Sequence, residues 1–156
     1  MFPDGVKGLP TLTDEGHQAV TLNALAQSYY FSGQPGQSVS LFRRANKIDE
    51  QQADKKNQQI GLSNLGWAFR EIGALREAAG AFQQALVLNR KLEDALWEGV
   101  SLKELGRVLH TTGAPQLSRV ALGRSQCIDA ERGDAQGEGL AIAYQAAWCD
   151  GPPFSS

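Results

Sequence analysis

The stretch LSNLGWAFREIGALREAAGAFQQALVL, residues 62–88, decides the fold of this chain of 156 residues. Its pattern of large and small side chains returns 40 residues earlier and 40 residues later, without an insertion or a deletion. The corresponding positions are Leu25, Ala26, Tyr29, Gly33, Ser38, Phe42 and Ala45 on the N-terminal side, and Leu105, Gly106, Leu109, Gly113, Ser118, Leu122 and Ser125 on the C-terminal side. A fixed period of this length predicts stacked repeats, each of which buries its apolar face against a neighbour.

Each 40-residue repeat is predicted to form a pair of α-helices. Leu62, Leu65 and Phe69 follow the i, i+3, i+7 spacing of one helix face, and Ala78 and Phe82 begin a second stripe. We therefore predict an all-α fold of seven helices, at about 14–32, 35–50, 54–72, 75–91, 94–112, 115–131 and 134–149. The repeats would span residues 14–53, 54–93 and 94–133, followed by a single capping helix at 134–149, with an irregular lead-in at 1–13 and a tail at 150–156.

An aspartate column marks the expected start of each first helix, at Asp14, Asp54, Asp94 and Asp134. A carboxylate at this place accepts unpaired backbone N–H groups and meets the positive end of the helix dipole. Neighbouring first helices lie about 8–10 Å apart, whereas the ligands of one calcium ion lie within about 2.6 Å of it. The column therefore predicts helix caps and no metal site.

The composition argues against several classes of function. A formal net charge of -2 gives no basic surface for a nucleic acid or an anionic membrane. The longest mostly apolar run, residues 139–149, is much shorter than a membrane span. Charged residues stand in the first ten positions, where a secretory signal has an apolar core, so a cytoplasmic protein is expected. The two cysteines, Cys127 and Cys149, are expected to be free, because the predicted helices would hold them too far apart for a disulfide.

The sequence offers no catalytic constellation. The two histidines, His17 and His110, fall in different repeats. No histidine–cysteine cluster with metal spacing, glycine-rich phosphate loop or nucleophile elbow is present. We therefore expect a protein that is not an enzyme and that needs no cofactor.

The repeat columns resemble those of the tetratricopeptide repeat (TPR) family. The middle repeat carries the resemblance most fully, with Leu62, Leu65, Gly66, Phe69, Gly73, Ala78, Phe82 and Ala85. The resemblance covers about residues 14–149, and it implies a right-handed α-solenoid of antiparallel helix pairs. The usual period of that family is 34 residues, so the period of 40 is similar to the long repeats of Pins/LGN scaffolds, kinesin light chains and the sensor halves of bacterial signalling ATPases.

In this family the first helices line a concave groove that binds peptides, and the resemblance implies the same here. The flank beside each core stripe supplies the candidate groove residues: Asn23, Gln27, Tyr30, Phe31, Ser63, Trp67, Arg70, Lys103, Arg107 and His110. A protein or peptide partner with apolar and acidic side chains would suit these aromatics and cations. Asn64 matches an asparagine of the family's carboxylate clamp, but the cations of that clamp are missing, so a carboxylate clamp is not expected.

Two other functions stay open at the level of sequence. The chain could be a sensor or regulatory fragment of a larger signalling protein that binds a small ligand or a peptide. It could also self-associate into a homo-oligomer, through the open end where helix 134–149 lacks a second helix. All three hypotheses place the function on a surface and none requires a reaction.

Overall fold

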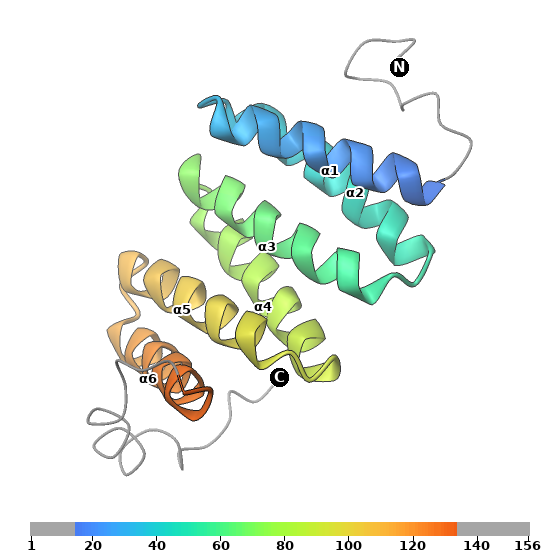
Figure 1. Ribbon diagram of the computed structural model, residues 1–156. Coiled ribbons are helices and arrows are strands. Elements are labelled where there is room, and N and C mark those ends of the chain that lie inside the picture. The colour runs from blue at the N-terminus through green and yellow to red at the C-terminus, as the bar shows by residue number, and fades with distance from the viewer. Residues whose placement is uncertain (1–14, 134–156) are drawn as a thin grey trace. The chain divides into compact units, whose positions relative to one another are not determined.

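The computed structural model describes residues 15–133, which fold into α-helices with no strand among them (Figure 1). The helices are α1 Glu15–Phe31, α2 Pro35–Gln51, α3 Lys55–Glu71, α4 Leu75–Lys91, α5 Ala95–Thr111 and α6 Pro115–Glu131. The all-α prediction is confirmed, and each of these six helices begins and ends within one residue of its predicted bounds. The predicted capping helix 134–149, the lead-in 1–13 and the tail 150–156 lie outside the described residues.

The period of 40 residues is visible in the helix starts. α1, α3 and α5 begin at residues 15, 55 and 95, and each is 17 residues long. The turns repeat twice as often, because a backbone with positive φ closes a helix at Gly33, Ala53, Gly73, Glu93, Gly113 and Gly133. Each closes its helix as a left-handed residue does, freeing the following N–H to bond back to the last turn, as Ala74 N does to the carbonyl oxygen of Phe69.

The caps predicted from the sequence are present at two helix starts. The Asp54 carboxylate accepts from Asn57 N at 3.0 Å, and the Asp94 carboxylate accepts from Trp97 N at 3.2 Å. Prolines open α2 and α6, where a missing N–H costs nothing. Asp14 and Asp134, the other two members of the column, lie outside the described residues.

The chain divides into two compact units, residues 1–81 (unit 1) and 82–156 (unit 2), which meet within α4. In unit 1, α1 and α2 form an antiparallel pair and α3 packs along α2 (Figure 1). The core residues of this unit come from the predicted stripes, among them Leu22, Ala26, Phe42, Leu65 and Phe69. α3 is therefore positioned mainly by its contact with α2.

Unit 2 is centred on the antiparallel pair of α5 and α6. The pair packs closely because Gly106 has no side chain: a Cβ there would lie 2.7 Å from Leu122 Cγ. Two buried serines of α6 reach across, since Ser118 Oγ donates to the carbonyl oxygen of Gly106 at 2.7 Å and Ser125 Oγ donates to that of Gly99 at 2.9 Å. These small residues of the repeat columns thus lie where the two helices meet.

The prediction of free thiols is wrong for Cys127, which is buried at the C-terminal end of α6 and takes part in a disulfide. That prediction rested on a helix at 134–149 that would carry Cys149 away from the turn, and this stretch lies outside the described residues. Of the helices in residues 15–133, none has the length and apolar character needed to cross a membrane.

Candidate functional site

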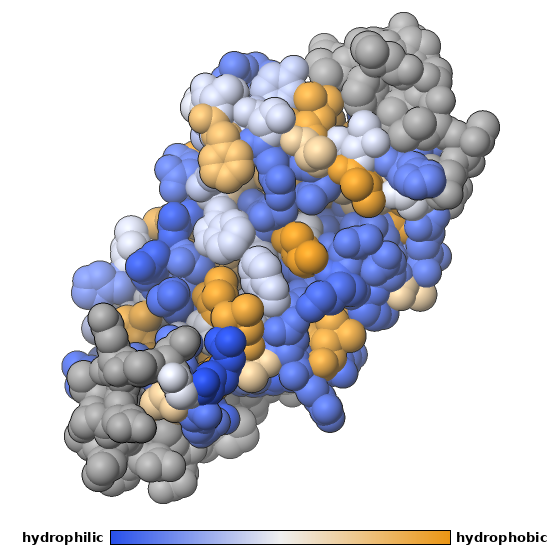
Figure 2. All heavy atoms as spheres, viewed as in Figure 1, coloured by the Kyte–Doolittle hydropathy of each residue, from blue (hydrophilic) through white to orange (hydrophobic). Residues whose placement is uncertain are grey.

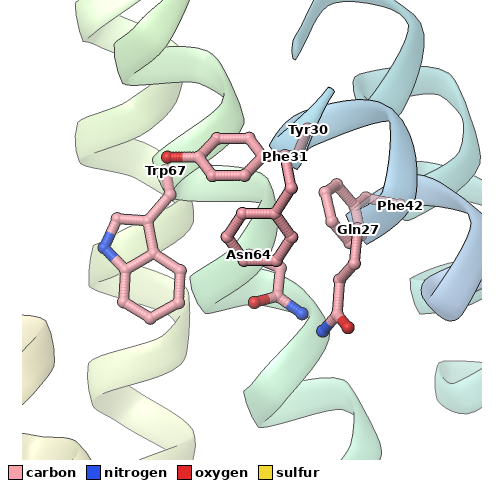
Figure 3. Close-up of a pocket in the computed structure, with 6 residues that line it drawn as sticks. All are labelled: Gln27, Tyr30, Phe31, Phe42, Asn64 and Trp67. Carbon is pink, nitrogen blue, oxygen red and sulfur yellow. The ribbon is translucent and has the colours of Figure 1, made fainter. Parts of the chain in front are cut away.

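A pocket opens in unit 1 between the three helices α1, α2 and α3 (Figure 3). It has a volume of about 60 Å³ and is lined by Gln27, Tyr30, Phe31, Phe42, Asn64 and Trp67. The first three come from the last turns of α1, Phe42 comes from α2, and the last two come from α3. A space of this size accepts part of one side chain rather than a whole small molecule.

Aromatic rings make most of the pocket wall. Phe42 is buried, with 1% of its surface exposed, whereas Phe31 is 81% exposed at the end of α1. The Tyr30 and Phe31 rings meet edge to face, with centroids 5.4 Å apart and planes at 82°. An apolar side chain that entered the pocket would cover Phe31, and removing apolar surface from water is favourable by about 25 cal/mol per Å².

The polar part of the pocket consists of uncharged amides. Asn64 Nδ2 donates to Asn23 Oδ1 at 3.2 Å, which joins α3 to α1. In Figure 3 the amide ends of Gln27 and Asn64 point to the same side of the pocket. Amides can donate to and accept from a peptide backbone without selecting for charge.

The structure brings four of the predicted groove residues together in this pocket, namely Gln27, Tyr30, Phe31 and Trp67. Asn23 supports it through its bond to Asn64. Arg70 is half-buried on the same helix as Trp67 and forms an ion pair with the neighbouring Glu71 at 3.3 Å.

Ser63 has to be removed from the predicted set. It is only 1% exposed, and its hydroxyl donates to the carbonyl oxygen of Gln59 at 3.1 Å within α3. The flank beside the core stripe of α3 is therefore narrower than the repeat register suggests. A serine is small enough for either side of a helix, so its residue type gave no warning.

Two pocket residues were not predicted as part of the site. Phe42 lies in a repeat column of large side chains, and this column was assigned to the core alone. Asn64 was considered only for a carboxylate clamp. Its position one residue before Leu65 and three before Trp67 was a usable signal, because residues three apart share a helix face.

The remaining predicted residues lie in unit 2. Lys103, Arg107 and His110 follow the i, i+4, i+7 spacing on α5, and we call them the α5 stripe. Arg107 and His110 are exposed and Lys103 is half-exposed. Arg107 Nη1 pairs with Glu104 Oε1 at 2.9 Å, so part of its charge is already compensated.

The described part of the chain contains no group of three or more histidine, cysteine or acidic side chains that could hold a metal ion. The exposed large apolar side chains are Val20, Phe31 and Ile72 in unit 1 and Val87, Leu92, Leu96 and Leu117 in unit 2. On the face drawn in Figure 2, hydrophobic residues stand in small groups among hydrophilic ones. Of these exposed side chains, Phe31 alone lines the pocket.

Comparison with known proteins supports TPR-type repeats. The tetratricopeptide repeat family model matches residues 62–96. No curated protein sequence is similar enough to count as a match.

Solved structures with the same fold belong to proteins of the kinesin light chain type. One is a kinesin light chain-like protein of Podosopora anserina with nearly identical TPR-like repeats, at 19% identity and a TM-score of 0.68 over 86% of this chain and 64% of that protein. A variant of the same protein gives 20% identity and a TM-score of 0.62 over 87% and 79%. BtubC (BKLC) from P. vanneervenii gives 15% identity and a TM-score of 0.63 over 97% and 73%. The chain thus spans under two thirds of the first of these proteins, and at such identities the likeness establishes the TPR-like solenoid fold alone.

Proposed function

We propose that this chain is a non-catalytic binding module that holds a segment of a partner protein, with an apolar side chain of the partner seated in the unit 1 pocket. The observation that carries the proposal is Phe31, a large aromatic residue that is 81% exposed and yet lines a pocket. Exposing such a ring has a cost unless a partner covers it, and aromatic anchors commonly dominate binding energy at protein interfaces.

The chemistry of the site favours a peptide over a small metabolite. The pocket holds about 60 Å³, and its polar groups are amides that suit a peptide backbone. The likeness to TPR-type structures agrees, since such repeats generally mediate contacts between proteins. The long 40-residue type of repeat that Pins/LGN and kinesin light chains share also belongs to this proposal, supported by the helix starts at residues 15, 55 and 95.

The α5 stripe supplies a preference for acidic side chains in the partner. Lys103 and His110 add cationic or potentially cationic groups to one face of α5, beside the paired Arg107. Surface charges of this kind contribute more to the rate of encounter and to selectivity than to affinity. We expect weaker binding of an acidic peptide at high salt and in a Lys103→Ala variant.

Selection from a displayed library of random peptides tests the proposal directly. Peptides recovered with the whole chain should share an apolar anchor residue, and the Phe31→Ser variant should bind them at least about tenfold more weakly, a loss of about 1.4 kcal/mol. Val20→Ser is the matched control, because Val20 is a second exposed apolar residue of α1 (55% exposed) outside the pocket.

Peptides that bind both variants equally well would remove the pocket from the proposal. Recovery of no peptide, together with stabilisation of the chain by a metabolite, would favour the sensor function instead. A concentration-dependent increase in mass by light scattering would favour self-association.

A cytoplasmic location stays a prediction from the sequence. The disulfide at Cys127 argues against it, because disulfides persist mainly in oxidising compartments. Counting reactive thiols in the chain recovered from its own cells distinguishes the two cases. Two free thiols per chain would fit the cytoplasm, and none would fit an oxidising compartment.

A further inference from the structure

The turns that join successive repeats differ in one buried residue. Ala53 with φ 57° links α2 to α3 in unit 1, and Glu93 with φ 54° links α4 to α5 in unit 2. A step of 40 residues relates Asp49 to Asn89, Asn57 to Trp97 and Gly61 to Ser101. The two junctions can therefore be compared atom by atom.

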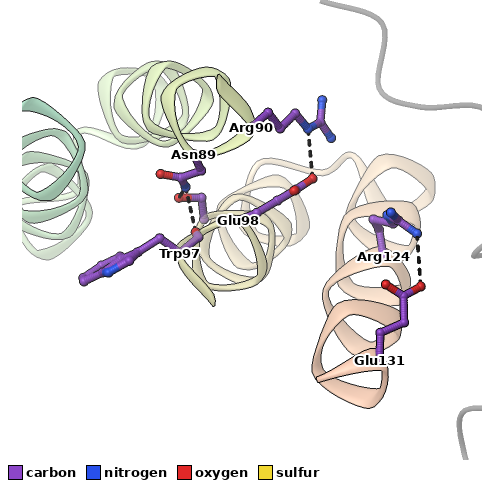
Figure 4. A network of polar contacts seen from close by, with 7 residues as sticks. Asn89, Arg90, Trp97, Glu98, Arg124 and Glu131 are labelled. Carbon is purple, nitrogen blue, oxygen red and sulfur yellow. Dashed lines mark hydrogen bonds and ion pairs between the residues drawn. The ribbon is translucent and has the colours of Figure 1, made fainter. Parts of the chain in front are cut away.

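In unit 2 the junction is tied by a buried amide. Asn89 Nδ2 donates to the carbonyl oxygen of Trp97 at 2.7 Å and to Ser101 Oγ at 2.8 Å (Figure 4). Asn89 is 0% exposed, so these bonds are shielded from water. They fix the end of α4 to the first turns of α5.

In unit 1 the same place holds a carboxyl group. Asp49 is 5% exposed at the end of α2, and the serine hydroxyl that assists Asn89 is replaced by Gly61. The space that a side chain at residue 61 would need is taken by Asn46, since a Cβ on Gly61 would collide with Asn46 Oδ1. The Asn46 amide itself is buried without a hydrogen-bond partner among the described residues.

An ionised carboxylate is poorly placed here. It has no hydrogen to donate to the carbonyl oxygen that corresponds to that of Trp97, namely the one of Asn57. Asp54 stands nearby, held as the cap of α3 by bonds to Asn57 N and Asn57 Nδ2 at 3.0 and 2.9 Å. Burial, and then the charge of Asp54, raise the pKa of Asp49 from 3.8 to about 6.

The other charged side chains on the adjoining turns are turned to water. They are His17 at the start of α1, Lys47 and Glu50 on α2, and Lys55 and Lys56 at the start of α3, all exposed. Water screens exposed charges, so these groups compensate a buried carboxylate only weakly.

We propose that Asp49 is a proton-dependent latch between α2 and α3: protonated, its carboxyl O–H donates to the carbonyl oxygen of Asn57 as Asn89 does to Trp97, and ionised, it leaves this junction untied. The unfolded chain releases this proton near pH 3.8 and the folded chain holds it to about pH 6. Between these values folding takes up a proton, so the contribution of Asp49 to stability grows as the pH falls from about 6 to about 4. The latch is open at neutral pH.

The direct test is a titration of the whole chain followed by the side-chain carboxyl carbon resonances of its aspartates in NMR spectra. The Asp49 resonance should titrate near pH 6, and an ordinary value near pH 4 would overturn the proposal. This measurement needs no variant, so it remains decisive if a substitution at residue 49 prevents folding.

Three variants test the hydrogen bond. Asp49→Asn should raise the unfolding midpoint at about pH 7.5, and its gain over the natural chain should shrink at about pH 5, where the natural carboxyl is protonated. Glu50→Gln, which removes a charge from an exposed neighbour, should show no such difference between the two pH values. Asp49→Leu removes the charge without supplying a donor, so it should gain less than Asp49→Asn.

Two results would contradict the latch. If the gain of Asp49→Asn is the same at both pH values, no proton is taken up at this residue on folding. If Asp49→Leu stabilises the chain as much as Asp49→Asn does, removal of the charge is the whole effect and no bond to Asn57 is formed.

Discussion

Two kinds of residue hold the left-handed backbone positions that close the helices. Gly33, Gly73 and Gly113 stand at the turns within the repeats, whereas Ala53 and Glu93 stand at the turns between them. A residue with a Cβ pays roughly 1–2 kcal/mol for this conformation, and glycine does not. The glycine turns could be placed from residue type, but an alanine or a glutamate carries no such signal.

Ala53→Gly should therefore stabilise the chain by about 0.5–1 kcal/mol, after the larger conformational entropy of glycine in the unfolded state is subtracted. Gly73→Ala is the reciprocal change and should destabilise it by about 1 kcal/mol. Both substitutions have room for their side chain, since nothing lies within 4 Å of a Cβ at Gly73. Urea unfolding followed by circular dichroism measures both, and two shifts of the same sign would show that backbone strain at residue 53 is not what limits stability.

At the level of the helices, the contact between α5 and α6 depends on Gly106. A methyl group there would meet Leu122 Cγ at 2.7 Å and the carbonyl oxygen of Ser118 at 3.2 Å, and the second of these is backbone that cannot turn away. We expect Gly106→Ala to lower the free energy of unfolding by about 1–3 kcal/mol, the usual cost of overpacking.

Gly80→Ala is the matched control for that change. Gly80 is also inside a helix, but nothing lies within 4 Å of a Cβ at this residue. Alanine favours a helix over glycine by about 1 kcal/mol, so this variant should be more stable than the natural chain. A similar response of both variants in thermal unfolding would mean that helix propensity, and not the α5–α6 contact, determines the outcome at Gly106.

The helices themselves could be predicted from the sequence because their signals are local. Apolar stripes, the caps Asp54 and Asp94 and the opening residues Pro35 and Pro115 each fix a bound within about one turn. Side chains that share a face across two helices could not be predicted in the same way. Asn46 fits against Gly61 and the Ser63 hydroxyl turns into its own helix, and both depend on how α2 and α3 lie against each other.

For the whole molecule, the period of 40 residues was sufficient to predict the fold, whereas the site was only partly predictable. The register identified Gln27, Tyr30, Phe31 and Trp67 because they share a face beside the core stripe. It could not separate Phe42 into a residue that is both core and pocket wall, since burial and contact with a pocket leave the same mark on a sequence. The net charge of -2 gives no further guide to a partner, because the cations of the α5 stripe are local.

Binding of a selected peptide should raise the stability of the natural chain. Folding is required for the pocket, so a ligand present at 100 times its Kd adds about 2.7 kcal/mol to the free energy of unfolding. The Phe31→Ser variant should gain much less from the same peptide at the same concentration, because its Kd has risen by at least about tenfold. Val20→Ser should gain as much as the natural chain does. Equal gains in all three would mean that the peptide binds elsewhere, and a gain that depends on the concentration of the chain itself would mean that the peptide acts on an oligomer and not on the pocket.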